Sequence, residues 1–85
     1  MAGAAPGTGM MVGMDDVPIR DGSIRLGQFL KLADLASDGG DARDMLESGQ
    51  VTVNDQPETR RGRQLAPGDV VAARGRTTRV VGPGA

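Results

Sequence analysis

The sequence predicts a small α+β domain in which two short helices are followed by a small antiparallel sheet. Apolar residues recur twice at helical spacing in the first half of the chain. Short alternating runs separated by turn residues fill the second half. The chain has 85 residues and 38% hydrophobic content, which is enough for one core and one domain.

The first helix is expected at about residues 26–36. Apolar residues recur there at the i, i+3, i+4 and i+7 spacing of one helix face. They are Leu26, Phe29, Leu30 and Ala33, with Leu32, Leu35 and Ala36 widening the stripe. A stripe this broad predicts a helix that packs on two sides.

The second helix is expected at about residues 39–48. Asp38 is suited to cap its first turn, and Asp41 three residues later makes a weak capping box. Ala42, Met45 and Leu46 supply its apolar face. Gly49 falls where a left-handed residue commonly ends a helix.

Short strands flank these helices. An entry strand is expected between residues 19 and 24, with a turn at Asp21-Gly22. Residues 51–53 alternate like a strand with one buried face, and Asn54-Asp55 suits a two-residue turn. Pro57 places the returning strand at an edge of the sheet, because proline has no N–H to donate.

A second hairpin completes the expected sheet. Pro67-Gly68-Asp69 predicts a turn that precedes it. Its strands are residues 70–73 and 77–81, joined around Arg74-Gly75-Arg76.

The ends of the chain lack these patterns. Residues 1–18 are expected to be a disordered arm, residues 19–81 the domain, and residues 82–85 a flexible tail. Met10, Met11 and Met14 allow the alternative that translation begins further in. The start lacks the basic and apolar regions of a signal peptide, and no apolar run approaches the roughly 20 residues that cross a bilayer. We therefore expect a cytoplasmic protein with no membrane partner.

The composition removes most catalytic chemistry. The chain has no histidine and no cysteine, so it lacks the commonest general base, the commonest metal ligand and any thiolate. Its carboxylates do not pair in an apolar context that would shift their pKa. We expect no enzyme, no metal, no cofactor and no small-molecule substrate, and we expect a monomer.

Charge is divided unevenly along the chain, although the net charge is only −1. Residues 1–55 hold four cations and nine acids, whereas residues 56–85 hold six arginines and two acids. This asymmetry is compatible with a basic face that grips a polyanion. It is equally compatible with a protein-interaction adaptor whose acidic and basic halves meet complementary patches on a partner.

Two segments are candidates for binding phosphate. Arg60-Arg61-Gly62-Arg63 brings three guanidinium groups together, which repel one another unless an anion lies among them. The start of the second helix, at Gly39-Gly40, offers free N–H groups, with Arg43 one turn further on. The alternatives are a solvated loop neutralised by Glu58 and a simple inter-helix loop whose amides are satisfied by aspartates.

Arg25 and Lys31 are further cations near the first helix. They are six residues apart, so they fall on different faces of an ideal helix. Both reach one RNA only if the RNA wraps around one end of the helix. Scattered surface cations are the alternative.

The ordered set of motifs resembles a known family. Arg25-Leu26, Ala42-Arg43, Leu46, the segment from Gly49 to Asn54, and Pro67 to Val71 follow the pattern of the S-four-type RNA-binding domain, the αL motif. The sequence is most similar to the short stand-alone bacterial members, and the likeness covers about residues 24–81. The resemblance implies a non-catalytic domain that binds ribosomal RNA or tRNA and is associated with the ribosome.

The same resemblance implies a set of RNA-binding residues on the two helices and the following hairpin. They are Arg25, Lys31, Gly40, Arg43, Asn54, Arg60, Arg61 and Arg63. The chain departs from the family pattern where Asp38-Gly39 replaces the usual serine–arginine pair, and where Asp55 replaces the usual glycine. The first departure removes a cation, so the resemblance implies that the arginine cluster carries more of the binding than the helix start.

Overall fold

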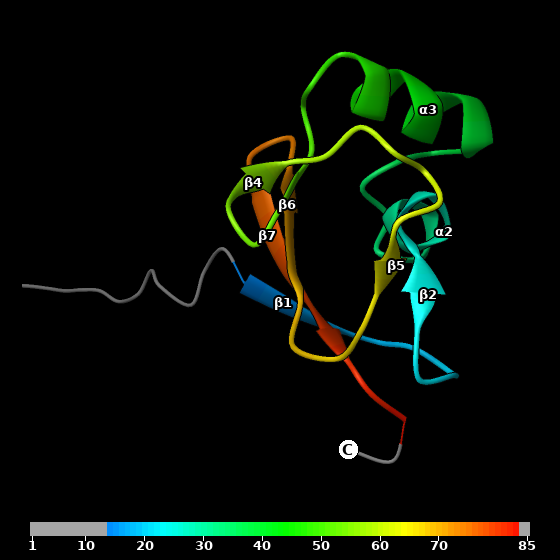
Figure 1. The fold of residues 1–85 in the computed structure, drawn as a ribbon, viewed down its shortest axis with the longest axis vertical. Helices are drawn as coiled ribbons and strands as arrows, with labels where there is room; N and C mark the ends of the chain where they lie inside the picture. The colour runs from blue at the N-terminus through cyan, green and yellow to red at the C-terminus, as the bar shows by residue number, and fades with distance from the viewer. Residues whose placement is uncertain (1–13, 84–85) are drawn as a thin grey trace, which may run out of the picture.

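Two helices and seven short strands make up the part of the chain that the computed structural model describes, residues 14–83 (Figure 1). The helices are α2 (Leu26–Leu32) and α3 (Gly39–Glu47). The strands are β1 (Met14–Pro18), β2 (Ile24–Arg25), β3 (Thr52–Val53), β4 (Gln56–Pro57), β5 (Gln64–Leu65), β6 (Val70–Ala73) and β7 (Arg76–Val81). The predicted α+β class is confirmed.

Five of the strands form one sheet in the order β1-β7-β6-β3-β4. All neighbours in it are antiparallel except β1 and β7, which run parallel. The remaining two strands, β2 and β5, form a separate antiparallel pair beside α2 (Figure 1). Both helices lie on the same side of the five-stranded sheet (Figure 1).

One apolar core joins the helices to the sheet. Its largest fully buried side chains are Phe29, Leu26, Leu30, Met45, Leu46 and Leu65. The valines of β3, β6 and β7 close it from the sheet side, because alternate residues of each strand point inward. Leu32, which the sequence placed in the apolar stripe, is instead 52% exposed.

Helix α2 ends earlier than expected, at Leu32 rather than near residue 36. Asp34 adopts a left-handed conformation, with φ of 61°. The Asp34 N–H donates to the Lys31 carbonyl and the Leu35 N–H donates to the Leu30 carbonyl, which together form a Schellman motif. The apolar spacing continues to Ala36, but the backbone leaves the helix at Asp34.

Helix α3 begins and ends nearly as expected. The Asp38 Oδ1 atom accepts a hydrogen bond of 2.8 Å from the Asp41 N–H, so Asp38 is the N-cap. At the other end, Gly49 has a φ of 78°, and the Gln50 N–H donates to the Met45 carbonyl. Local capping signals therefore predicted both boundaries of α3 to within a residue.

The expected disordered arm is wrong for its last five residues. Met14–Pro18 form β1, paired along its whole length with β7, and the Ile19 N–H extends the pairing to the Val81 carbonyl. Side chains add two cross-strand ion pairs, Asp15–Arg76 and Asp16–Arg79. Residues 1–13 of the arm, and residues 84–85 of the expected tail, lie outside the described residues.

The turns of the sheet follow the sequence more closely than its strand ends. Asn54 and Asp55 both have positive φ values, 52° and 68°, and join β3 to β4 as a two-residue turn. Pro57 lies in the edge strand β4, as expected. The entry strand expected over residues 19–24 is reduced to β2, and its partner β5 has no signal in the sequence.

Neither helix within residues 14–83 has the length and apolar character needed to cross a membrane.

Candidate nucleic-acid interface

A groove of about 620 Å³ lies where the start of α2, the segment between β4 and β5, and the start of α3 meet. Its lining includes four cations, which are Arg25, Lys31, Arg60 and Arg61, and no acid. Its other lining residues are Gly27, Gln28, Gly39, Ala42 and Gly62. We call this surface the basic groove. It is a concave site with one sign of charge, which favours an anionic ligand.

The segment from Glu58 to Arg63, here called the arginine loop, is fixed against the start of α2 by its backbone. The Leu26 N–H donates to the Arg63 carbonyl at 2.8 Å, and the Gly27 N–H donates to the Arg61 carbonyl at 3.0 Å. These bonds satisfy N–H groups that no side chain caps, since the Arg25 side chain makes no capping bond. The arginine loop is therefore the cap of α2, and its arginines are held beside the helix.

Gly27 is the point of α2 that lies against Arg61 of the loop. A Cβ atom at this position would meet the Cβ of Arg61 at 3.4 Å and its carbonyl oxygen at 3.6 Å. These are ordinary van der Waals distances, so the arginine loop packs directly against the backbone of α2 at this position.

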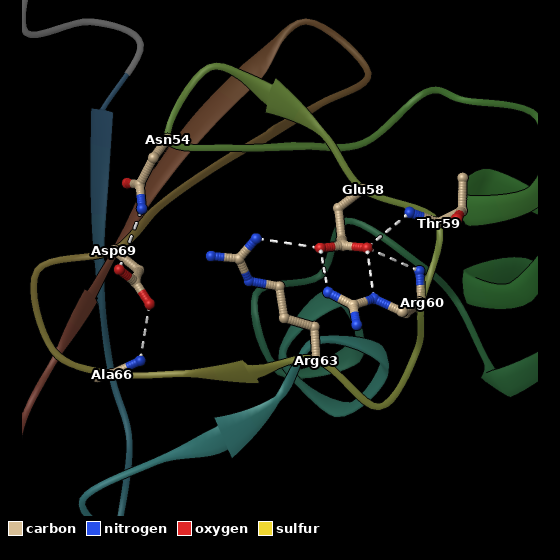
Figure 2. Close-up of polar contacts among 7 residues, drawn as sticks. All are labelled: Asn54, Glu58, Thr59, Arg60, Arg63, Ala66 and Asp69. Atoms are coloured by element: carbon tan, nitrogen blue, oxygen red, sulfur yellow. Dashed lines mark hydrogen bonds and ion pairs between the residues drawn. The ribbon is translucent and has the colours of Figure 1, made fainter.

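Glu58 organises the arginine loop from within. It is 8% exposed, and its Oε2 accepts from the backbone N–H groups of Thr59 and Arg60 and from Arg60 Nε (Figure 2). Its Oε1 accepts from Arg63 Nη1 at 3.0 Å. Hydrogen bonds from Arg60 and then Arg63 lower the pKa of the Glu58 carboxyl to about 2. Glu58 therefore neutralises part of the loop, which is the alternative that the sequence left open.

Arg61 is the arginine of the arginine loop that has no acidic partner within residues 14–83. Within residues 14–83 its side chain makes no hydrogen bond or ion pair, and the same is true of Arg25 and Lys31. Arg60 is paired with Glu58 but keeps 76% of its side chain exposed. The basic groove thus presents three unpaired cations and one exposed, paired arginine.

Arg25 and Lys31 line the same groove. Their six-residue spacing had predicted that they lie on different faces of a helix. Arg25 precedes α2 and has an extended backbone, with φ of −75° and ψ of 144°. The angle of 100° per residue therefore does not apply between these two positions. The expectation that they lie on different faces was wrong for this reason.

The start of α3 contributes to the groove through Gly39 and not through Gly40. Two of the acids at this helix start, Asp38 and Asp41, have partners of their own. Asp41 accepts from the Ser37 N–H at 2.8 Å and forms a two-pronged ion pair with Arg74, with Nη2–Oδ1 at 2.7 Å. The hydrogen bond from Arg74, then that from Ser37, lowers the pKa of Asp41 to about 2. Asp41 is thereby turned toward the β6–β7 turn.

Three more of the expected site residues do not line the basic groove. Arg43 pairs with Glu47 one turn along α3, at 3.0 Å. Arg63 is directed to Glu58. Asn54 lies in the β3–β4 turn, where it contacts Asp69 (Figure 2). The sequence analysis did not predict that Gln28 lines the groove. The signal for it was its place one turn before Lys31 on the same helix face.

The C-terminal arginines outside the loop are neutralised by acids of the N-terminal half. The three pairs are Arg74–Asp41 at 2.7 Å, Arg76–Asp15 at 3.2 Å and Arg79–Asp16 at 2.9 Å. Three of the six C-terminal arginines and three of the nine N-terminal acids are thus neutralised by contacts within the domain. Of the four cations within residues 14–83 that have no acidic partner, Arg25, Lys31 and Arg61 line the basic groove, and Arg20 lies outside it.

Comparison with known proteins agrees with this architecture. A family model described as the S4 domain matches residues 17–81. The chain is also similar to the Bacillus subtilis (strain 168) protein named "Probable ribosome maturation protein RlbA", with 56% identity over 52 residues, covering 61% of this chain and 73% of that protein. The match to the family model spans both helices, the arginine loop and all strands except the first part of β1. The chain belongs to the S4 domain family.

Proposed function

We propose that this protein is a non-catalytic RNA-binding module that recognises structured RNA, ribosomal RNA or tRNA, and acts at the ribosome in the cytoplasm. The observation that carries the proposal is the basic groove, in which four cations and no acid line one concave surface. Neither histidine nor cysteine is available for catalysis, and the groove lining offers no carboxylate.

The unpaired cations supply the driving force. Arg25, Lys31 and Arg61 are exposed and have no anionic partner within residues 14–83, so contact with phosphate breaks no existing ion pair. If the exposed Arg60 joins these three cations, four phosphates are neutralised and their counterions released, so log affinity should fall with log salt at a slope of roughly −3 to −4. A cationic surface that was already paired would show a smaller slope.

The mode of recognition is inferred from what the groove lacks. Phe29 is the single aromatic residue, and it is fully buried in the core. No aromatic side chain is therefore available as a stacking platform for bases. Contacts to phosphates and to the shape of a folded RNA are the remaining mode, as is usual for duplex and structured RNA.

The name of the Bacillus subtilis relative supports association with the ribosome, since that protein is described as a ribosome maturation protein. The adaptor function, in which acidic and basic halves bind a partner protein, is less well supported. Asp15, Asp16 and Asp41 are already paired with arginines of the same domain. These three acids are therefore not free to meet a cationic partner protein.

A pair of matched variants tests the proposal. Arg61→Gln removes an unpaired cation of the basic groove, whereas Arg79→Gln removes a cation that is paired with Asp16 outside it. The two changes alter net charge equally. Binding to a fluorescently labelled structured RNA should weaken markedly for Arg61→Gln, with a shallower salt slope, and little for Arg79→Gln. Equal effects of the two variants, or no measurable RNA binding, would contradict the proposal and would favour the adaptor function instead.

A further inference from the structure

A second groove, of about 490 Å³, adjoins the basic groove at α2. The two grooves share two lining residues, Gln28 and Lys31, which lie one turn apart on α2. Lys31 and Gln28 therefore form the ridge between the grooves. A ligand that occupies the basic groove reaches the second groove by crossing one turn of helix.

The second groove differs chemically from the first. It has one cation of its own, Arg20, which is exposed and makes no hydrogen bond or ion pair within the described part of the chain. Asp21 is the single acid of its lining. The groove also presents Leu32, 52% exposed, next to the half-buried Ile24. It combines a weakly positive charge with a large exposed apolar side chain, Leu32, and no such side chain lines the basic groove.

We propose that a single-stranded segment of the bound RNA crosses α2 at Gln28 and Lys31 and lies in the second groove. A phosphate of this segment contacts Arg20, and an unpaired base packs on Leu32. This inference rests on the proposed function, because the segment is a continuation of RNA held in the basic groove.

The chemistry of the second groove selects for an unpaired strand. A duplex directs its phosphates outward and hides the faces of its bases, so an exposed leucine gains nothing from it. An unstacked base offers an apolar face that removes Leu32 from water. The amide of Gln28 adds a donor and an acceptor at the ridge for a base edge. Because Phe29 is buried, Leu32 is the large apolar side chain available near the cations.

Three RNAs separate this inference from the proposed function. One is a blunt hairpin, and the other two are the same hairpin with a short single-stranded extension at its 5′ or its 3′ end. The wild-type protein should bind one of the extended RNAs about tenfold more tightly than the blunt hairpin, which corresponds to about 1.4 kcal/mol. Arg20→Gln and Leu32→Ser should each reduce that gain and leave binding to the blunt hairpin unchanged.

Matched variants complete the experiment. Arg61→Gln should weaken all RNAs alike, whereas Arg79→Gln should weaken none of them. Asp21→Asn, which removes the acid of the second groove, should strengthen binding of the extended RNA alone. For Arg20→Gln the salt slope should become less steep by roughly 0.7 on the extended RNA. Thermal melting checks that each variant is folded, which is expected because Arg20, Asp21 and Leu32 are exposed.

The outcomes are distinct. If Arg61 contributes to binding but neither extension adds affinity, or if Arg20→Gln and Leu32→Ser do not affect the gain, the inference about the second groove is overturned and the proposed function stands. If binding to every RNA is independent of Arg61, the proposed function itself is overturned. The inference is supported if an extended RNA binds more tightly than the blunt hairpin and if this gain in affinity requires both Arg20 and Leu32.

Discussion

Glu58 and Arg63 are joined across the arginine loop by a hydrogen bond of 3.0 Å from Arg63 Nη1 to Glu58 Oε1. The carboxylate lies almost fully buried beneath the loop, and its other oxygen accepts from Thr59 and Arg60 (Figure 2). A buried carboxylate with both oxygens engaged fixes the path of the loop around it. Since this loop also caps α2, Glu58 is a positioning residue for the cations of the basic groove.

Replacing Glu58 by glutamine should weaken RNA binding, although it removes a negative charge. An amide has one acceptor oxygen in place of two, so it cannot maintain all the bonds from Thr59, Arg60 and Arg63. The loop then loses its fixed conformation, and Arg60 and Arg61 are no longer held in place beside α2. Binding isotherms at two salt concentrations measure the effect.

Asp55→Asn is the matched control for this prediction. Asp55 is exposed in the β3–β4 turn, and asparagine tolerates its left-handed backbone. This variant should bind RNA as well as the wild type or slightly better, because only the net charge changes. If Glu58→Gln and Asp55→Asn both increased RNA affinity over the wild type by the same factor, Glu58 would act through its charge alone.

Stability should decrease as the pH falls from about 5 to about 2. The pKa values of Glu58 and Asp41 are lowered to about 2 by their arginine partners, from ordinary values of 4.5 and 3.8. Between these values the unfolded state binds more protons than the folded state, so acid favours unfolding. The stabilisation is fully present above pH 5 and is lost as both carboxyls are protonated.

Urea unfolding at a series of pH values tests this acid dependence. A Glu58→Gln/Asp41→Asn double variant should be less stable at neutral pH and should have a flatter dependence between pH 5 and 2. Asp55→Asn should keep the slope of the wild type, since Asp55 has no such partner within residues 14–83. A double variant with an unchanged slope would assign the acid sensitivity to other groups.

Leu46→Ala should destabilise the domain by about 2–5 kcal/mol, because it leaves a cavity in a close-packed core. The Leu46 side chain is fully buried on the inner face of α3. Leu32→Ala is the control, since more than half of that side chain is already in water. The midpoint of urea unfolding should shift strongly for Leu46→Ala and hardly at all for Leu32→Ala.

The parts of the fold that sequence predicted are those with local causes. Asp38 caps α3 through an atom three residues away, and Gly49 ends it because glycine tolerates a positive φ. The Asn54-Asp55 turn follows in the same way. The end of α2 was missed because Asp34 makes the left-handed turn there, and aspartate adopts that conformation less often than glycine.

The remaining misses arise from long-range pairing. Strand β1 pairs with β7 through a parallel register and through Asp15–Arg76 and Asp16–Arg79, partners about 60 positions apart. The local sequence of β1, Met-Asp-Asp-Val-Pro, does not predict this pairing. The sequence predicted the basic groove only in part, again because its residues come together through a long-range contact. Arg61 lies near Arg25 and Lys31 because the arginine loop caps α2.

Asn54→Ala should reduce stability by about 1–3 kcal/mol and should leave RNA affinity unchanged in the folded protein. The Asn54 Oδ1 accepts from the Val70 N–H at 2.9 Å, and its Nδ2 donates to Asp69 Oδ1 at 3.1 Å, which joins the β3–β4 turn to the start of β6. Alanine removes both bonds and is strained at a φ of 52°. Asn54→Gly removes the bonds without the strain, so it should cost less, and the difference between the two variants in urea unfolding isolates the backbone contribution. Because Asn54 does not line the basic groove, a loss of RNA affinity at a temperature where Asn54→Ala is fully folded would return this residue to the RNA interface.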